Sequence, residues 1–258
     1  MKDRSNPPRH GSPAKSSEAR DRLFAAPLSK IEAFRFDAQV AAVFDDMIDR
    51  SVPGYRTIVA AIGLLAGEIA QPDGYCYDLG CSLGAASFAM AHEITAPGCR
   101  IIAVDNAWPM LVRLRERLRI LAGPTPVQPV CADLRHVPIR NASLVVLNFT
   151  LQFIPPTERL ELLQAVHEGL RPGGGLILSE KIALEDPRQQ AIFTDLHHAF
   201  KRAQGYSELE ISQKRAALEN VLIPETLATH RGRLKASGFS SSEVWFQYFN
   251  FVSLVAFK

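Results

Sequence analysis

The chain has 258 residues, a formal net charge of +2, 47% hydrophobic residues and 22% charged residues. This is the composition of an ordinary globular protein, long enough for one α/β domain with additional helices but short for two full domains. The small net charge gives no argument for a nucleic-acid partner or a membrane surface, and no apolar run approaches the roughly 20 residues that a membrane-spanning helix needs.

The N-terminal segment, residues 1–20, differs from the rest of the chain. It is rich in Pro, Ser and basic residues and has almost nothing to bury, which predicts a disordered basic tail. No apolar stretch follows the first residues, so we expect no secretory signal. The four cysteines contain no CxxC pair, and we expect free thiols in a reducing compartment, the cytoplasm. These cysteines are Cys76, Cys81, Cys99 and Cys131.

Residues 21–258 are predicted to form a single domain. Apolar residues recur at helical spacing over 36–48 and 58–69, which predicts an N-terminal helical cover. Short apolar runs then alternate with helical patterns, and strands buried on both faces with helices between them predict a parallel, doubly wound α/β sheet. The predicted strands are 75–79, 100–104, 127–131, 143–148 and 175–179, and the predicted helices between them are 84–94, 107–121 and 157–170.

The C-terminal part of the chain has a different pattern. Helical patterns at 187–203, 207–220 and 224–237 predict a helical insertion over residues 187–237. Two β-rich runs, 243–246 and 251–257, then predict an antiparallel hairpin at the edge of the sheet, which brings the number of strands to seven. Such an ending is typical of the Rossmann-like class I methyltransferase fold, a mostly parallel sheet, and is absent from ordinary dinucleotide-binding domains.

The loop after the first predicted strand, Asp78-Leu79-Gly80-Cys81-Ser82-Leu83-Gly84, is the candidate cofactor cradle. Gly80 and Gly84 lack side chains where the chain must turn sharply and a ligand approaches the backbone. A dinucleotide site would instead need G-x-G-x-x-G to place a pyrophosphate on the helix N-terminus. The loop therefore favours a ligand without phosphates, S-adenosylmethionine, although glycines at a strand–helix turn can also be purely structural.

Polar residues follow three further predicted strands. Asp105 ends the second strand, where a carboxylate can accept hydrogen bonds from both hydroxyls of a ribose. Asp133 follows the third strand, where it can meet an adenine amino group while Leu134 packs on the ring, and Asn148 ends the fourth. Each acid alone could be a helix cap or a solvated loop residue. Together they indicate one site, because open α/β sheets bind ligands at the carboxyl ends of their strands.

Other residues give no chemistry by themselves. His197 and His198 lie side by side on a predicted helix without the spacing of metal ligands, so we expect no metal and a surface or packing role. No group that would activate an acceptor is evident in the sequence.

Four segments together resemble the family of carboxy-S-adenosyl-L-methionine synthases, bacterial enzymes that supply the donor for carboxymethylation of tRNA wobble uridine. The resemblance covers residues 21–258, and the last segment is the most discriminating. The segments are RSVPGY (50–55), DLGCSLGA (78–85), VLNFTLQF (146–153) and GYSELEISQKR (205–215).

The resemblance implies a reaction. S-adenosylmethionine and prephenate would become carboxy-S-adenosylmethionine and phenylpyruvate, with carbon dioxide and hydroxide both released by prephenate. Because the hydroxide would deprotonate the sulfonium methyl, the enzyme would need no general base of its own. The family also implies a homodimer, with no direct requirement for nucleic acid and no membrane.

The resemblance further implies roles for particular residues. Arg215 would bind the new carboxylate, a task that suits a planar fork of donors, although from the sequence alone it is an arginine on a solvated helix face. Lys181, Arg202 and Tyr206 are candidates for holding prephenate. The implied S-adenosylmethionine ligands are Tyr55, Gly80, Cys81, Ser82, Asp105, Asn106, Asp133, Leu134, Asn148 and Arg215.

Two alternatives stay open at this point. One is an ordinary S-adenosylmethionine-dependent methyltransferase of a small molecule or tRNA, and the other is a non-catalytic S-adenosylmethionine-binding subunit. A cation near the sulfonium argues against the first, and the completeness of the predicted pocket argues against the second.

Overall fold

The computed structural model describes residues 19–121 and 123–258. The predicted basic tail therefore lies outside the described residues, apart from its last two positions. The predicted Rossmann-like class I methyltransferase fold is confirmed. Its strands are β1 (Tyr75–Leu79), β2 (Arg100–Asp105), β3 (Val127–Cys131), β4 (Ala142–Asn148), β5 (Leu170–Lys181), β6 (Ser241–Tyr248) and β7 (Phe251–Phe257).

The seven strands form one sheet in the order β3-β2-β1-β4-β5-β7-β6. Strands β1 to β5 are parallel, whereas β7 is antiparallel to both β5 and β6, as the predicted C-terminal hairpin requires. Strand β5 begins five residues earlier than predicted, because the turn before Gly175 continues its pairing with β4 across a register shift. All of β4 except its last residue is buried, which places the sheet's apolar centre between β1 and β5.

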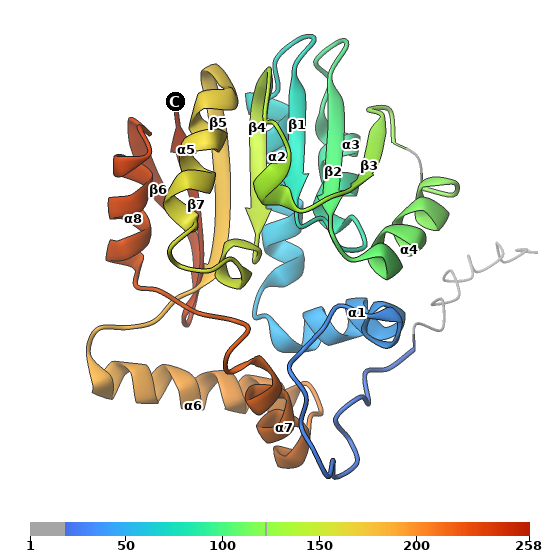
Figure 1. The fold of residues 1–258 in the computed structure, drawn as a ribbon, viewed down its shortest axis with the longest axis vertical. Helices are drawn as coiled ribbons and strands as arrows, with labels where there is room; N and C mark the ends of the chain where they lie inside the picture. Colours follow the sequence, from blue (N-terminus) through green and yellow to red (C-terminus); the bar gives the residue numbers. More distant parts are fainter. Residues whose placement is uncertain (1–18, 122) are drawn as a thin grey trace, which may run out of the picture.

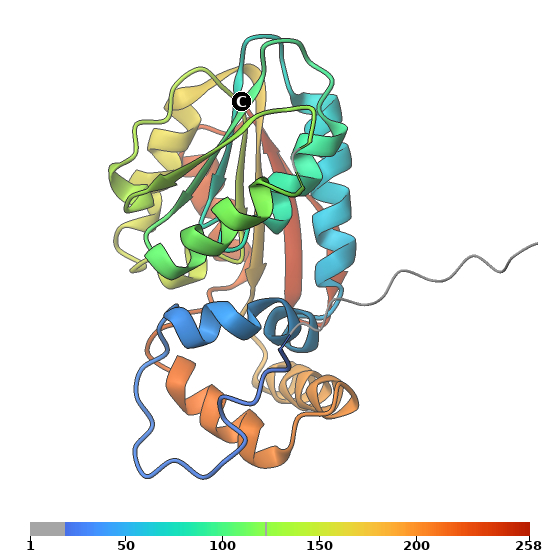
Figure 2. The same ribbon diagram turned by 90° about the vertical axis from the view of Figure 1, so that its right-hand side faces the viewer.

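Helices cover both faces of the sheet (Figures 1 and 2). Those packed on one face are α2 (Tyr55–Ile69), α3 (Ala85–Glu93) and α4 (Trp108–Leu118), and those on the other are α5 (Arg159–Gly169) and α8 (Leu227–Ala236). Each face has its own apolar core. Ile58, Ile62 and Met90 are fully buried on the first face, and Leu163 and Val166 on the second.

Three more helices lie beyond the carboxyl ends of the parallel strands, where they form a separate layer (Figures 1 and 2). They are α1 (Ala38–Ser51), α6 (Pro187–Ala203) and α7 (Glu208–Leu218). Each begins with a side-chain cap: Asp37 and Asp186 accept backbone N–H groups, and Ser207 forms a capping box with Glu210. We call these helices, together with the extended segment of residues 19–37, the helical cover.

The described residues contain two 3₁₀ turns, η1 (Leu134–His136) and η2 (Leu151–Phe153), which follow β3 and β4. No single helix of the described chain is long and apolar enough to cross a membrane; α1 and α2 would pass only as a pair, and they are bent by 98° at their junction. The cysteines Cys76, Cys81 and Cys99 are free and buried, as expected for buried thiols, whereas Cys131 is free but exposed.

Arg159 joins the α5 side of the sheet to the segment before α8. Its side chain is completely buried, forms an ion pair with Glu225, and donates hydrogen bonds to the carbonyls of Ile154, Gln152 and Ile223. Burial of a guanidinium is tolerated only where its donors are paired in this way.

We therefore expect Arg159→Ala to lower the free energy of unfolding by about 3–5 kcal/mol, because three carbonyls and the Glu225 carboxylate lose their donor and a fully buried side chain is removed. Urea unfolding followed by circular dichroism measures this effect. Arg202→Ala is the control: Arg202 pairs with Glu208 at the surface, and its loss should change stability by about 0.5 kcal/mol or less. Equal effects for the two variants would contradict the assignment.

Candidate active site

A cavity of about 550 Å³ lies between the carboxyl edge of the sheet and the helical cover. Its lining combines the ends of β1, β2, β4 and β5, the segment after β3, and side chains from α1, α6 and α7. Aromatic residues from several of these elements form much of its wall: Phe34, Phe36, Phe44, Tyr55, Phe149, Phe153 and Phe251. The site is therefore the crevice that parallel α/β sheets provide, closed over by additional helices.

The loop between β1 and α3 has the backbone geometry of a ligand cradle. Gly80, Ser82 and Gly84 all have positive φ values, of 81°, 49° and 85°. A Cβ at Gly80 would lie 2.4 Å from the side chain of Thr150, so this glycine is required by close packing as well as by conformation. Ser82 adopts the left-handed conformation although it is not glycine, and its N–H donates to Asp105 Oδ2 at 2.8 Å.

One buried and one half-buried carboxylate lie behind this loop. Asp78, at the end of β1, accepts a hydrogen bond from Ser87 Oγ at 2.6 Å, and burial raises its pKa to about 6. Asp105, at the end of β2, accepts the N–H groups of Ser82 and Ala107 at 2.8 Å each. Burial also raises the pKa of Asp105. This part of the cavity therefore concentrates negative charge, which suits a cationic ligand.

Asp133 lies beyond β3, at the far end of this acidic side. Its carboxylate binds Arg135 through Nε at 2.9 Å and Nη2 at 2.5 Å, and this hydrogen bonding lowers the pKa of Asp133 to about 2. Arg135 in turn forms an ion pair with Glu158. Asp133 and Leu134 both line the cavity, so the aspartate is held ionised and in a fixed orientation at its rim.

The end of β4 carries two unusual features. Asn148 Oδ1 is buried without a hydrogen-bond partner in the part of the chain that the structure describes, although the residue lines the cavity. An orphaned acceptor of this kind fits a ligand that brings a donor. Phe149 has a φ of 59°, and its ring contacts those of Tyr55 and Phe251. A bulky residue in this conformation is strained, and such strain concentrates at functional sites.

The opposite side of the cavity is basic. Lys181 ends β5, His197 and Lys201 come from α6, and Lys214 comes from α7. His197 Nε2 lies 2.8 Å from the carbonyl oxygen of Ser51, and its pKa is lowered by burial and by the neighbouring lysines. The histidine is therefore neutral near pH 7, and the positive charge on this side belongs to the lysines.

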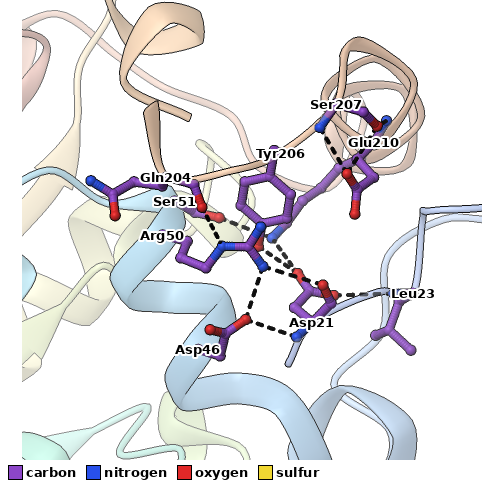
Figure 3. Close-up of polar contacts among 10 residues, drawn as sticks. Asp21, Leu23, Asp46, Arg50, Ser51, Gln204, Tyr206, Ser207 and Glu210 are labelled. Carbon is purple, nitrogen blue, oxygen red and sulfur yellow. Dashed lines mark hydrogen bonds and ion pairs between the residues drawn. The ribbon is translucent and has the colours of Figure 1, made fainter. Parts of the chain in front are cut away.

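A buried polar network fixes the helical cover over this basic side (Figure 3). Arg50 donates to Gln204 O at 2.8 Å, to Asp21 O at 3.2 Å and to Asp46 Oδ2 at 2.9 Å. Its guanidinium also stacks on the Tyr206 ring at 3.8 Å, and the Tyr206 hydroxyl donates to Asp21 Oδ2 at 2.6 Å. The network thus ties α1, the end of α6 and the extended N-terminal segment together.

Nine of the ten ligand residues predicted from the sequence line this one cavity: Tyr55, Gly80, Cys81, Ser82, Asp105, Asn106, Asp133, Leu134 and Asn148. The tenth, Arg215, is exposed on α7 and is not part of the lining. Of the prephenate candidates, Lys181 lines the cavity, Arg202 pairs with Glu208 at the surface, and Tyr206 belongs to the network of Figure 3.

Sequence reasoning missed Lys201 and Lys214 and did not place His197 in a site. Lys214 directly precedes Arg215 in the motif used for the resemblance, so the segment was found but the inward-facing residue was not. His197 and Lys201 are spaced i, i+4 and share one helix face, a weak signal that charged surface helices also produce.

Comparison with known proteins agrees with this geometry. Residues 77–174 match the family described as a methyltransferase domain. The carboxy-S-adenosyl-L-methionine synthase of Geobacter metallireducens is 63% identical over 239 residues, which are 92% of this chain and 98% of that protein. The protein of the same name from Yersinia pestis is 53% identical over 97% of this chain and 94% of its own length.

The chain belongs to the carboxy-S-adenosyl-L-methionine synthase family.

Solved structures of other proteins share the fold of this synthase family member at low identity. An O-methyltransferase family protein from Burkholderia thailandensis superposes with a TM-score of 0.61 at 17% identity, over 86% of this chain and 60% of that one. The magnesium protoporphyrin IX methyltransferase of Synechocystis superposes with a TM-score of 0.53 at 18% identity, over 80% of each chain. The synthase family thus uses the class I methyltransferase architecture.

Asp78 gives a pH-dependent prediction for this synthase family member. Its folded pKa of about 6 exceeds the ordinary 3.8, so the folded state binds the proton more tightly and stability is lost as pH rises from about 4 to about 6. Asp78→Asn removes this titration. The unfolding free energy of the variant minus that of the wild type should therefore increase by about 1–2 kcal/mol from pH 5 to pH 8. Urea unfolding of both proteins across that range measures it, and a pH-independent difference would contradict it.

Proposed function

We propose that this protein converts S-adenosylmethionine and prephenate into carboxy-S-adenosylmethionine and phenylpyruvate. The observation that carries the proposal is the division of one cavity into an acidic and a basic side. Asp78 and Asp105 lie at the ends of β1 and β2 and Asp133 follows β3, while Lys181 ends β5. A cationic sulfonium and an anionic second substrate can therefore meet in front of β4, where Asn148 lies.

The proposed S-adenosylmethionine ligands are those implied by the family resemblance. Gly80, Cys81 and Ser82 hold the methionine portion along the loop, and Tyr55 closes on it from the start of α2. On the nucleoside side, Asp105 with Asn106 binds the ribose, and Asp133 with Leu134 binds the adenine. The support for these roles is that the residues line one cavity and that the backbone at Gly80 and Ser82 already has the required turn.

The chemistry balances without a base from the protein. Prephenate breaks its bond to the ring carboxylate, which leaves as carbon dioxide, and its hydroxyl leaves as hydroxide while the ring becomes aromatic. Hydroxide removes a proton from the sulfonium methyl to give water. The resulting ylide carbon then bonds to carbon dioxide, which gives the carboxymethyl group. The residues of the cavity have to orient the two substrates, exclude water and place charge.

The aromatic wall suits this requirement. The rings of Tyr55, Phe149 and Phe251 are in contact next to Asn148, so the proposed reacting end of the cavity is largely apolar. An apolar surrounding keeps bulk water from the ylide and retains carbon dioxide until it is captured.

We also propose that the protein acts as a cytoplasmic homodimer and that Arg215 binds the new carboxylate. The pKa of Lys181 is lowered by burial and, to a smaller extent, by the positive charge of Arg215, which supports a position of Arg215 near the basic side of the cavity. The exposure of Arg215 on α7 is compatible with a contribution to the site of either subunit.

Product analysis tests the reaction. Purified protein incubated with S-adenosylmethionine and prephenate should form carboxy-S-adenosylmethionine and phenylpyruvate in equal amounts, as measured by mass spectrometry. Formation of S-adenosylhomocysteine with a methylated acceptor would instead identify an ordinary methyltransferase. Binding of S-adenosylmethionine without any turnover would identify a non-catalytic subunit.

Arg215→Ala should abolish formation of the carboxylated product, because the new carboxylate loses its proposed partner. S-adenosylmethionine binding, measured by calorimetry, should be retained, since Arg215 is outside the cavity lining. Arg188→Ala, an exposed arginine on α6, serves as the control. An unchanged product yield for Arg215→Ala would remove this residue from the mechanism.

A further inference from the structure

Three lysines converge on the basic side of the cavity from three different elements. Lys181 comes from β5, Lys201 from α6 and Lys214 from α7, and all three side chains line the cavity. Lys201 and Lys214 are only 8% and 5% exposed. A fold rarely buries even one ammonium group without a specific reason, because desolvation disfavours the charged form.

These lysines have few anionic partners within the protein. Within the part of the chain that the structure describes, only Lys214 makes an ion pair, with Asp21 at 3.5 Å, and it also donates to Ser51 Oγ at 3.0 Å. Lys201 has no ion pair among these residues, and the Lys181 ammonium lies 6.0 Å from the centre of the Phe251 ring. Buried charges are normally paired, so this group as a whole lacks negative charge.

The surrounding groups increase this imbalance. Lys201 faces two other lysines, Lys181 from β5 and Lys214 from α7. Asp21 from the extended segment is the partner of Lys214, and His197 lies on the same helix as Lys201. Burial and the two neighbouring lysines lower the pKa of Lys201 to about 7. Burial lowers that of Lys214 to about 8, with Asp21 opposing the shift.

We propose that Lys201 and Lys214 form the subsite that binds the carboxylate retained by the second substrate throughout the reaction. This inference rests on the proposed function, in which prephenate brings two carboxylates and only the ring carboxylate is lost. The bound carboxylate supplies the negative charge that the lysines lack, and the subsite orients the substrate with its ring carboxylate toward the sulfonium methyl.

The assignment to the retained carboxylate follows from position and from chemistry. Lys181 lies two residues beyond Ser179, which pairs in register with Asn148. Of the three lysines, Lys181 is therefore the one that the sheet holds close to the proposed reacting end. Lys201 and Lys214 belong instead to the helical cover. Two cations on the ring carboxylate would stabilise its anionic form and oppose its loss as carbon dioxide. The same cations on the retained carboxylate stabilise the substrate, the transition state and the product equally.

The experiment compares prephenate with phenylpyruvate, which has only the retained carboxylate. Lys201→Met should raise the KM for prephenate and the Kd for phenylpyruvate by the same factor, about 10- to 100-fold, the range for loss of a charged hydrogen bond. Phenylpyruvate binding is measured by calorimetry on protein saturated with S-adenosylhomocysteine, so it does not depend on turnover. The affinity for S-adenosylhomocysteine should stay within about twofold, since the adenosyl side of the cavity is unaltered.

Arg188→Met removes a positive charge from the exposed face of the same helix and should leave both constants unchanged. An unchanged phenylpyruvate Kd in Lys201→Met would overturn the subsite, and so would a loss confined to prephenate, which would place the lysine on the ring carboxylate. If the wild-type protein forms no carboxylated product, the proposed function fails. If the wild type forms the product but Lys201→Met binds phenylpyruvate normally, only this inference is refuted. The variant should remain folded with an equal or higher urea midpoint, because it removes a desolvated cation.

Proton uptake provides a second readout. At pH 8 the Lys201 amine is mostly neutral in the free protein, since its pKa is about 7, whereas the bound carboxylate favours the ammonium form. Phenylpyruvate binding to the wild type at pH 8 should therefore take up protons, and affinity should increase as pH falls from 9 to 7. Calorimetry in buffers of different ionisation enthalpy measures this uptake, which should be smaller in Lys201→Met. Equal uptake by the two proteins would contradict the role of Lys201.

Discussion

Arg50 holds together the elements on which the cavity depends. A parallel sheet provides only a shallow crevice at its carboxyl edge, and here α1, α6 and the extended N-terminal segment convert that crevice into an enclosed site. Arg50 bonds to all three through its contacts with Asp46, Gln204 O and Asp21 O, and it stacks on Tyr206. The guanidinium can do this because its donors lie in one rigid plane that reaches several acceptors simultaneously.

The enclosed site separates opposite charges. Carboxylates follow the strands on one side of β4, and lysines approach from β5 and from the cover on the other. Burial of each set disfavours its charged form, since it raises the pKa of Asp78 and lowers that of Lys201. The cost is offset when a cation and an anion bind, so ligands complete an electrostatic arrangement that the protein leaves unfinished. Stability is given up locally to bind two unlike substrates, as is common at active sites.

Much of the fold was predictable from the sequence because the signals are local. The strand runs, the glycine turn at residues 80–84 and the polar residues at strand ends all follow from period, conformation and the rule that ligands bind at the carboxyl edge. The same rule predicts that Asp105, Asp133 and Asn148 lie near one another, and all three line the cavity. Arg215 shows where this reasoning ends: which face of α7 points inward depends on how α7 packs on α6 and on the extended segment, and the lining residue is its neighbour Lys214. The rotation of α7 about its own axis is set by tertiary packing. The sequence pattern of the helix does not fix this rotation when both neighbouring residues, Lys214 and Arg215, are basic.

The extended segment of residues 19–37 has a consequence for how the site is assembled. Asp21 contacts Tyr206 across 185 positions of sequence, and Gln213 donates to the carbonyls of Phe24 and Ala26 across 189 and 187 positions. Contacts between residues so far apart in sequence have the largest entropic cost of loop closure, and they form late in folding. During synthesis, the N-terminal segment can bind α1 early but must wait for Tyr206 and α7 before its remaining partners are present. The sheet can be largely complete while the substrate pocket does not yet exist, so catalytic competence should lag behind the acquisition of secondary structure.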